Sequence, residues 1–403
     1  MRYAAVTFVF QASVLLFGAP QSWEQRTLEA NRLQEAGNYA EAANLYKAAL
    51  EEAGTFAPEG SRRAESLNNL ASVYHATGRY ALAETLYRQA LAAVKNDDRK
   101  LALMSSNLAV LYRATGRYAE AAPLYAQALA SFQRAGMEGV EYAVCLTNLA
   151  ELYRAESKFA EAEVAARKAA DILEKTSSPA SPKLADALNS WGLAERGAGR
   201  YDQAETLLRR SLAIREQSLG PENAAVGASY NNLAELLAAQ HRYREAEALA
   251  RRSLAILENA LGPKHPMVAN SLNGLAQVLR FESRDIEVEP LYRRALAIWE
   301  QSAGPRHPDY ARCLGNLADY YRERGKEKKA VELYKHSIEI LTSVLGPDHP
   351  EVSMERERLA MVHGIARKAP TAPEVKSFSS NGTQLVERLG MREIHSSQTQ
   401  FVQ

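Results

Sequence analysis

The sequence lacks an excess of charge of either sign. Its 403 residues carry 49 Lys and Arg against 48 Asp and Glu, a formal net charge of +1. Proteins that bind the phosphate backbone of nucleic acids usually show a marked basic excess. The charge balance therefore argues against bulk nucleic-acid binding, and the apolar fraction of 46% is ordinary for a globular protein.

Cysteine is almost absent, with only Cys145 and Cys313 in the chain. They lie 168 residues apart, which is four times the 42-residue period described below, so they take matching places four repeats apart. A disulfide requires Cα atoms within about 7 Å, and such a separation forbids one. We expect two small buried side chains, and the cysteine content neither supports nor excludes an oxidising compartment.

The sequence also lacks the motifs of familiar catalytic and nucleotide sites. It contains no Gly-x-x-x-x-Gly-Lys loop, no Gly-x-Ser-x-Gly elbow, no His-Glu-x-x-His pair and no Cys-x-x-Cys. The best metal candidates are His265, His307 and His349, which recur one repeat apart. Stacked helices lie about 8–10 Å apart, whereas zinc binds nitrogens at about 2 Å. We predict no catalysis, no cofactor and no metal, and hydrogen bonds for these histidines.

Residues 1–22 are predicted to be a signal peptide. Arg2 supplies a positive start, the stretch from Ala4 to Phe17 is apolar except for three residues, and Ala19 opens an imperfect cleavage zone. The stretch is short for a membrane span, which needs about 20 apolar residues. The prediction is an exported protein, periplasmic or secreted, and the alternative is a membrane anchor formed by residues 4–19.

A Leu-Ala pair, usually preceded by asparagine, recurs along most of the chain. The repeated leucine or its substitute stands at positions 70, 108, 149, 191, 233, 275, 317 and 359. The last five intervals are all 42 residues, which chance does not give. Self-similarity at a fixed period of this length is the signature of a repeat array.

Each repeat carries two amphipathic helical patterns. In the second unit Leu67, Leu70 and Tyr74 share one face of a first helix, and Gly78 ends it. A second pattern follows, with small residues at the places of Ala83 and Ala90 in nearly every unit. Small side chains at these places let the two helices approach closely.

The connectors between the later repeats share one form, Gly-Pro-x-His-Pro. It begins at Gly262, Gly304 and Gly346, and a degenerate version begins at Gly220. Glycine suits the end of one helix, and the second proline suits the first position of the next.

These residues resemble the tetratricopeptide repeat, and the 42-residue period, the Asn-Asn-Leu-Ala string and the connectors resemble the kinesin-light-chain type. The resemblance covers residues 24–365. It implies an all-α fold, a right-handed superhelical α-solenoid of about eight stacked antiparallel helix pairs with a concave groove. The fifth unit departs at Trp191-Gly192, and the seventh has Asp285 and Val288 where other units have Tyr and Ala.

Two places on the first helices form a stripe that the resemblance puts in the groove. The residue before the leucine and the residue five after it lie six apart, close to two helical turns. The predicted peptide-binding residues at these places are Asn69, Asn107, Asn148, Asn232, Asn316, Arg113, Arg154, Arg196, Arg280 and Arg322. Amides can bond a peptide unit, and arginine can bind a carboxylate through two nitrogens.

Other interpretations of the stripe remain open. The asparagines can instead bond the adjacent helix, and the arginines can instead pair with acids such as Glu151, Glu195 or Asp319 on a solvated face. Exposed pairs of that kind contribute only about 0–1 kcal/mol each.

The predicted function is a protein-interaction scaffold or adaptor that binds a partner protein or peptide in the concave groove, in particular an acidic or C-terminal segment. The alternatives are a peptide-responsive regulatory subunit and a structural protein that self-assembles. Residues 366–403 are predicted to be a disordered tail because prolines near Ala369 break helix and the following residues are polar. Residues 385–394 could form a short helix.

Overall fold

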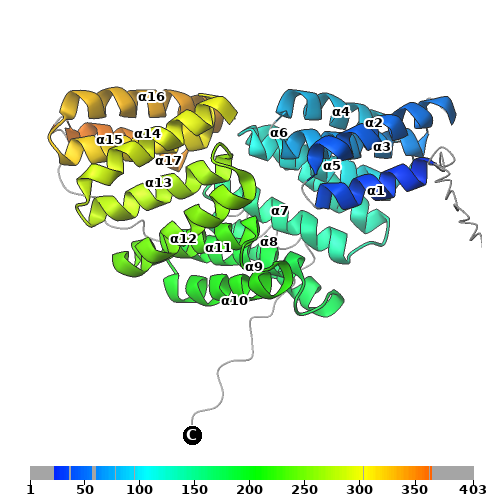
Figure 1. Ribbon diagram of the computed structural model, residues 1–403, viewed down its shortest axis with the longest axis horizontal. Coiled ribbons are helices and arrows are strands. Elements are labelled where there is room, and N and C mark those ends of the chain that lie inside the picture. Colours follow the sequence, from blue (N-terminus) through cyan, green and yellow to red (C-terminus); the bar gives the residue numbers. More distant parts are fainter. Residues whose placement is uncertain are drawn as a thin grey trace, which may run out of the picture. The chain divides into compact units, whose positions relative to one another are not determined.

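The computed structural model describes residues 22–35, 38–56, 60–77, 79–94, 96–302, 304–362 and 364. Over this part of the chain there are only helices, packed in consecutive pairs, and no strand (Figure 1). This confirms the predicted all-α architecture of stacked helix pairs. The predicted tail at 366–403, with its helix at 385–394, lies outside the described residues, and so does the predicted signal segment except for Ser22.

The helices fall into two compact units, and the first ends at Val94. The first unit contains α1 (Trp23–Glu35), α2 (Tyr39–Phe56), α3 (Ser61–Ala76) and α4 (Tyr80–Ala93). The second unit contains α5 (Asp98–Ala114), α6 (Tyr118–Arg134), α7 (Val140–Ala155), α8 (Phe159–Thr176), α9 (Pro182–Gly197), α10 (Tyr201–Leu219), α11 (Ala224–Ala239), α12 (Tyr243–Leu261), α13 (Pro266–Phe281), α14 (Asp285–Ser302), α15 (Pro308–Glu323), α16 (Glu327–Leu345) and α17 (Pro350–Val362). Helices α1 to α16 make eight pairs, and α17 follows the last pair.

Small side chains lie where the two helices of a pair approach. The place of Ala83 is fully buried in seven units, as Ala42, Ala83, Ala121, Ala162, Ala204, Ala246 and Ala330. Serines at the place of Ala90 are buried too, and two of them donate their hydroxyls to the first helix of the same pair. Ser211 donates to the Ala185 carbonyl at 2.7 Å and Ser337 to the Ala311 carbonyl at 2.9 Å. Close approach is thus combined with satisfied polar groups.

The two irregular units keep this packing. In the fifth, Trp191 packs against a cluster of Ala150, Ala165 and Ala166. At Gly192 the second helix of the pair lies so close that a Cβ on this residue would be 2.9 Å from Leu208 Cγ. In the seventh, Val288 fills the small-residue place with no exposed surface. The departures in sequence therefore change the contacts without interrupting the stack.

The connectors act as predicted from their glycine, histidine and proline. Gly262, Gly304 and Gly346 follow their helices with φ of 83°, 87° and 90°, where residues with a Cβ are strained. The imidazole Nδ1 of each connector histidine accepts a hydrogen bond from the backbone N–H two residues on, at 3.1–3.2 Å. These bonds satisfy an otherwise unpaired donor at the start of α13, α15 and α17.

Both cysteines are buried free thiols, as expected. Burial raises the pKa of Cys145 to about 12, so its reactive thiolate is scarce at neutral pH. None of the described helices combines the length and the apolar character that a membrane span requires.

Candidate functional site

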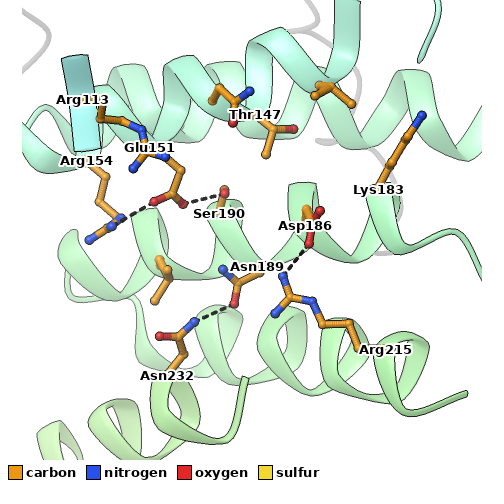
Figure 2. A pocket seen from close by; sticks show the side chains of 13 residues that line it. Arg113, Thr147, Glu151, Arg154, Lys183, Asp186, Asn189, Ser190, Arg215 and Asn232 are labelled. Carbon is orange, nitrogen blue, oxygen red and sulfur yellow. Dashed lines mark hydrogen bonds and ion pairs between the residues drawn. The ribbon is translucent and has the colours of Figure 1, made fainter. Parts of the chain in front are cut away.

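A cavity of about 360 Å³ lies on the first helices of four consecutive repeats, all in the second unit. Its walls come from α5, α7, α9 and α11, with one residue from α10 (Figure 2). The polar lining residues are Arg113, Thr147, Asn148, Glu151, Arg154, Lys183, Asp186, Asn189, Ser190, Arg215 and Asn232. Four of these are cationic and two are anionic, so the cavity carries an excess of positive charge.

Glu151 is held as a carboxylate at one side of the cavity. It accepts hydrogen bonds from Arg154 Nη2 at 2.9 Å and from Ser190 Oγ at 2.6 Å. Burial alone would raise the pKa of Glu151, but Arg154, Arg113 and the Ser190 hydroxyl lower it to about 2. The carboxylate therefore offsets one of the two arginines beside it and leaves the charge of the other in excess.

Arg113 lies at the end of α5, and its Nε is buried without a hydrogen-bond partner. Its positive charge lowers the pKa of Glu151, which lines the cavity, and counteracts the rise that burial causes in the pKa of Tyr125. The Arg113 side chain lines the cavity, so an anionic ligand there can gain a charge-assisted hydrogen bond from its guanidinium group.

Arg215 reaches the opposite side of the cavity from the second helix α10. It donates to Asp186 Oδ1 and to Ser229 Oγ, both at 2.6 Å, and its side chain is only 8% exposed. The predicted stripe was confined to first helices and did not contain Arg215. One signal could have found it, because seven other units have an apolar residue at this place, namely Ala53, Val94, Phe132, Leu173, Leu257, Trp299 and Leu341.

Two amide side chains pair across the floor of the cavity. Asn232 Nδ2 donates to Asn189 Oδ1 at 2.8 Å (Figure 2). The same contact recurs outside the cavity between Asn316 and Asn273 at 3.1 Å. This matches the interpretation in which asparagines bond the adjacent helix. The pair uses one donor and one acceptor, so the Asn232 oxygen and the Asn189 NH₂ retain capacity for a peptide unit.

The structure brings together four of the ten predicted site residues, Asn148, Asn232, Arg113 and Arg154. Asn69 belongs to the first unit. The other five lie on first helices of the second unit outside the cavity, as Asn107, Arg196, Asn316, Arg280 and Arg322.

The arginines outside the cavity mostly face carboxylates. Arg196 pairs with Glu235 of the next repeat, Arg322 lies 3.3 Å from Asp319, and Arg280 lies 3.5 Å from the same carboxylate. These three arginines therefore follow the alternative interpretation, in which the arginines of the stripe pair with acids. Glu195, one of the acids named for that interpretation, pairs with Arg200, which is not part of the stripe.

A second charged cluster lies between α13, α15 and α17. Asp319 Oδ1 accepts from the Tyr334 hydroxyl at 2.5 Å, and its other oxygen lies 3.6 Å from Arg358. Glu355 faces the same cluster with one buried oxygen that has no hydrogen-bond partner. Within the part of the chain that the structure describes, no group of three or more His, Cys, Asp or Glu residues could hold a metal ion.

The model of the tetratricopeptide repeat family matches residues 28–96, 100–175, 183–259, 228–288 and 268–343. None of the curated proteins matches the chain.

Among solved structures, a Rap protein complexed with Competence and Sporulation Factor is 14% identical over 85% of this chain and 97% of its own, with a TM-score of 0.56. The apo form of RapI is 17% identical over 69% of this chain and 97% of its own, with a TM-score of 0.51. The nearly identical TPR-like repeats of a kinesin light chain candidate from Podosopora anserina are 24% identical over 49% of this chain and 94% of their own, with a TM-score of 0.38. These likenesses concern the fold, and the family match covers more than half of the chain. The protein belongs to the tetratricopeptide repeat family and resembles its kinesin-light-chain type, as its sequence predicts.

Proposed function

We propose that the chain is an interaction protein that binds an extended segment of a partner across α5, α7, α9 and α11, with a carboxylate of that segment beside Arg113 and Arg154. The observation that carries this proposal is the cavity itself, where excess positive charge and paired amides lie on four consecutive first helices. No catalytic step is part of the proposal.

The chemistry of the cavity suits such a segment. A carboxylate beside Arg113 can accept a charge-assisted hydrogen bond from its guanidinium group, which lines the cavity. The amides of Asn148, Asn189 and Asn232 can bond the peptide units that follow, because each offers donors and an acceptor. A preformed array of helices pays little ordering cost when it binds.

The fold offers a precedent for a bound partner. A Rap protein of similar fold forms a complex with Competence and Sporulation Factor. At 14% sequence identity we do not infer that this chain binds the same partner. The complex supports the proposal only as an example of a similar helical array that holds a second molecule.

The test is a fluorescence titration of the full chain against an array of labelled octapeptides. Each peptide is made with a free C-terminal carboxylate, with an amidated C-terminus, and with or without internal Asp and Glu. We expect carboxylate-bearing peptides to bind more tightly than their neutral matches, and the difference to shrink at high salt. If amidation of the C-terminus abolishes tight binding, the site recognises a C-terminal carboxylate. If it does not, the site recognises internal Asp or Glu side chains.

Arg113→Ala is expected to weaken binding of the best peptide about 10- to 100-fold, the equivalent of one or two charge-assisted hydrogen bonds. Arg99 is exposed on the same helix α5, so Arg99→Ala serves as the matched control. Equal binding by wild type, Arg113→Ala and Arg99→Ala, at both low and high salt, would contradict the proposed site.

We also propose that the protein is exported, as its first 22 residues suggest, and that an anchor at residues 4–19 is the alternative. N-terminal sequencing of the mature protein from its native host tests this. Cleavage near Ala19 supports export. An intact Met1 in protein that is not bound to membranes contradicts both the exported protein and the membrane-anchored alternative.

A further inference from the structure

Within the second unit, a hydrogen bond joins residues that are 193 positions apart in the sequence. His307 Nε2 lies 2.8 Å from the carbonyl oxygen of Ala114, while Nδ1 of the same ring accepts from the Asp309 N–H. Because Nδ1 is an acceptor, the neutral ring carries its proton on Nε2 and donates it to Ala114. The connector before α15 therefore holds the end of α5.

Close packing accompanies this bond. Gly116, which follows α5 with φ of 76°, is buried against the connector. A Cβ at this position would lie 3.0 Å from Pro308 Cγ and Cδ and from Val344 Cγ1. On the other side, the indole of Trp299 stacks on the His307 ring with centroids 4.7 Å apart and planes 9° apart. The imidazole is thus fixed in the orientation that reaches Ala114.

The next connector comes near the end of α7 one repeat later, without an equivalent hydrogen bond. His349 Nδ1 caps α17, whereas its buried Nε2, near the backbone of Glu156 that follows α7, has no hydrogen-bond partner. Arg312 links the two connectors, because it binds Asp309 at 2.5 Å and Glu351 at 2.8 Å. Its charge also acts on the buried Tyr118 hydroxyl at the start of α6.

These contacts lie directly beside the cavity. Ala114 adjoins Arg113, and Glu156 is two residues after Arg154. The charges of Asp309 and Arg312 act on Arg154 in opposite senses. The two connectors therefore lie at the ends of α5 and α7, which supply Arg113 and Arg154 to the cavity.

We propose that the His307 and His349 connectors form a clasp that closes the second unit at the edge of the cavity, and that opening this clasp controls the entry of a partner segment. The role in entry rests on the proposed function, whereas the clasp itself does not. The clasp consists of few contacts between two connectors and two helix ends, so it can open without unfolding the helix pairs that it joins.

The structure supplies a variant that removes the clasp and keeps the helix cap. In the sixth unit the connector has Asn223 at the histidine place, and its side chain caps α11 by accepting from the Ala225 N–H at 2.9 Å. His307→Asn should therefore keep the cap of α15 and lose the bond to Ala114. His265→Asn is the matched control, because His265 caps α13 in the same way and takes no part in the clasp.

Gly116→Ala is a second variant that we expect to open the clasp. The added Cβ strains the backbone and collides with Pro308 and Val344, whereas at Gly199, with φ of 79°, a Cβ meets nothing within 4 Å. Gly199→Ala therefore reproduces the backbone strain without touching the clasp.

The experiment measures the distance between spin labels at Ala119→Cys and Arg306→Cys, two exposed positions on either side of the clasp. The native cysteines are buried and do not compete for the label. We expect one narrow, short distance in the otherwise wild-type full chain and in His265→Asn and Gly199→Ala. His307→Asn and Gly116→Ala should give a broad, longer distribution while circular dichroism keeps the native helix content. A narrow, unchanged distance in both clasp variants, or a broad one in the wild type, overturns the clasp.

Peptide entry is measured on the same proteins by stopped-flow association of the tightest octapeptide from the array. We expect His307→Asn to associate at least threefold faster than His265→Asn. Equal association rates, together with an opened label distance, would retain the clasp and overturn its control of entry. If no octapeptide binds, the proposed function fails and the label distances still decide the clasp.

Discussion

At the scale of single residues, Arg215 shows where the chain departs from its own repeat. Seven units fill this place with an apolar side chain, and the fifth unit places a buried arginine there, paired with Asp186. The Asp186 side chain is 55% exposed, and ion pairs with an exposed partner contribute little to stability. Stability alone therefore does not explain the arginine, whereas a cationic wall in the cavity does.

Arg215→Leu is accordingly expected to change the free energy of unfolding by less than about 1 kcal/mol, or to raise it, because leucine is what other units carry and Asp186 keeps its contact with water. The same variant should weaken peptide binding. Chemical denaturation and the octapeptide titration provide the two measurements.

Leu257→Met, at the same place in the sixth unit, is the control for altered packing at a residue that does not line the cavity. A loss of more than about 2 kcal/mol in Arg215→Leu, with peptide binding intact, would show that Arg215 serves the fold and not the cavity.

Glu355 gives the fold a dependence on pH. Burial raises its pKa to about 7, Asp319 and Glu351 add to this effect, and Arg358 opposes it. Because the folded protein holds this proton more tightly than the unfolded chain, the free energy of unfolding falls as pH rises from about 4.5 through about 7.

Glu355→Gln should therefore remove part of that fall. We expect it to match the wild type near pH 5 and to exceed it by about 1–3 kcal/mol near pH 8, as judged from urea denaturation at each pH. Glu357→Gln, an exposed change on the same helix α17, should leave the pH dependence unaltered. Parallel curves for the wild type and Glu355→Gln would contradict the assignment.

At the scale of helices, the later connectors determine where α11, α13, α15 and α17 begin. His265, His307 and His349 cap three helices through Nδ1, and Asn223 caps α11 through its amide oxygen. The histidines thus serve as helix caps, and His307 also uses its Nε2 for a hydrogen bond across the unit.

Asn223→Ala should lower the free energy of unfolding by about 1 kcal/mol, the usual cost of a lost side-chain cap, and Asn223→Asp should restore it. Thermal denaturation followed by circular dichroism measures both. An unchanged midpoint in Asn223→Ala would show that the cap at α11 contributes nothing.

At the scale of the whole molecule, the sequence predicted the helix pairs, their caps and the small-residue contacts, because these follow from periodicity and local sterics. It also predicted four cavity residues, among them Arg113 and Arg154. It did not predict which members of the stripe converge, because that depends on the small rotation between successive pairs, which accumulates over several repeats.

Two other features could not be predicted from the sequence, because they too depend on how successive helix pairs are placed in space. Asn232 pairs with Asn189, one place away from the predicted stripe, since the offset between neighbouring first helices sets the partner. His307 meets Ala114 only because the second unit curves back on itself, and no local pattern records a contact across 193 residues.

The central claim is that the first helices α5, α7, α9 and α11 hold the partner segment. Hydrogen-exchange mass spectrometry of the full chain, with and without the tightest octapeptide, tests it most directly. The account predicts that added protection is confined to these helices around Arg113, Glu151, Ser190 and Asn232. Protection of the second helices α6, α8 and α12 instead, with these four positions unchanged, would contradict it.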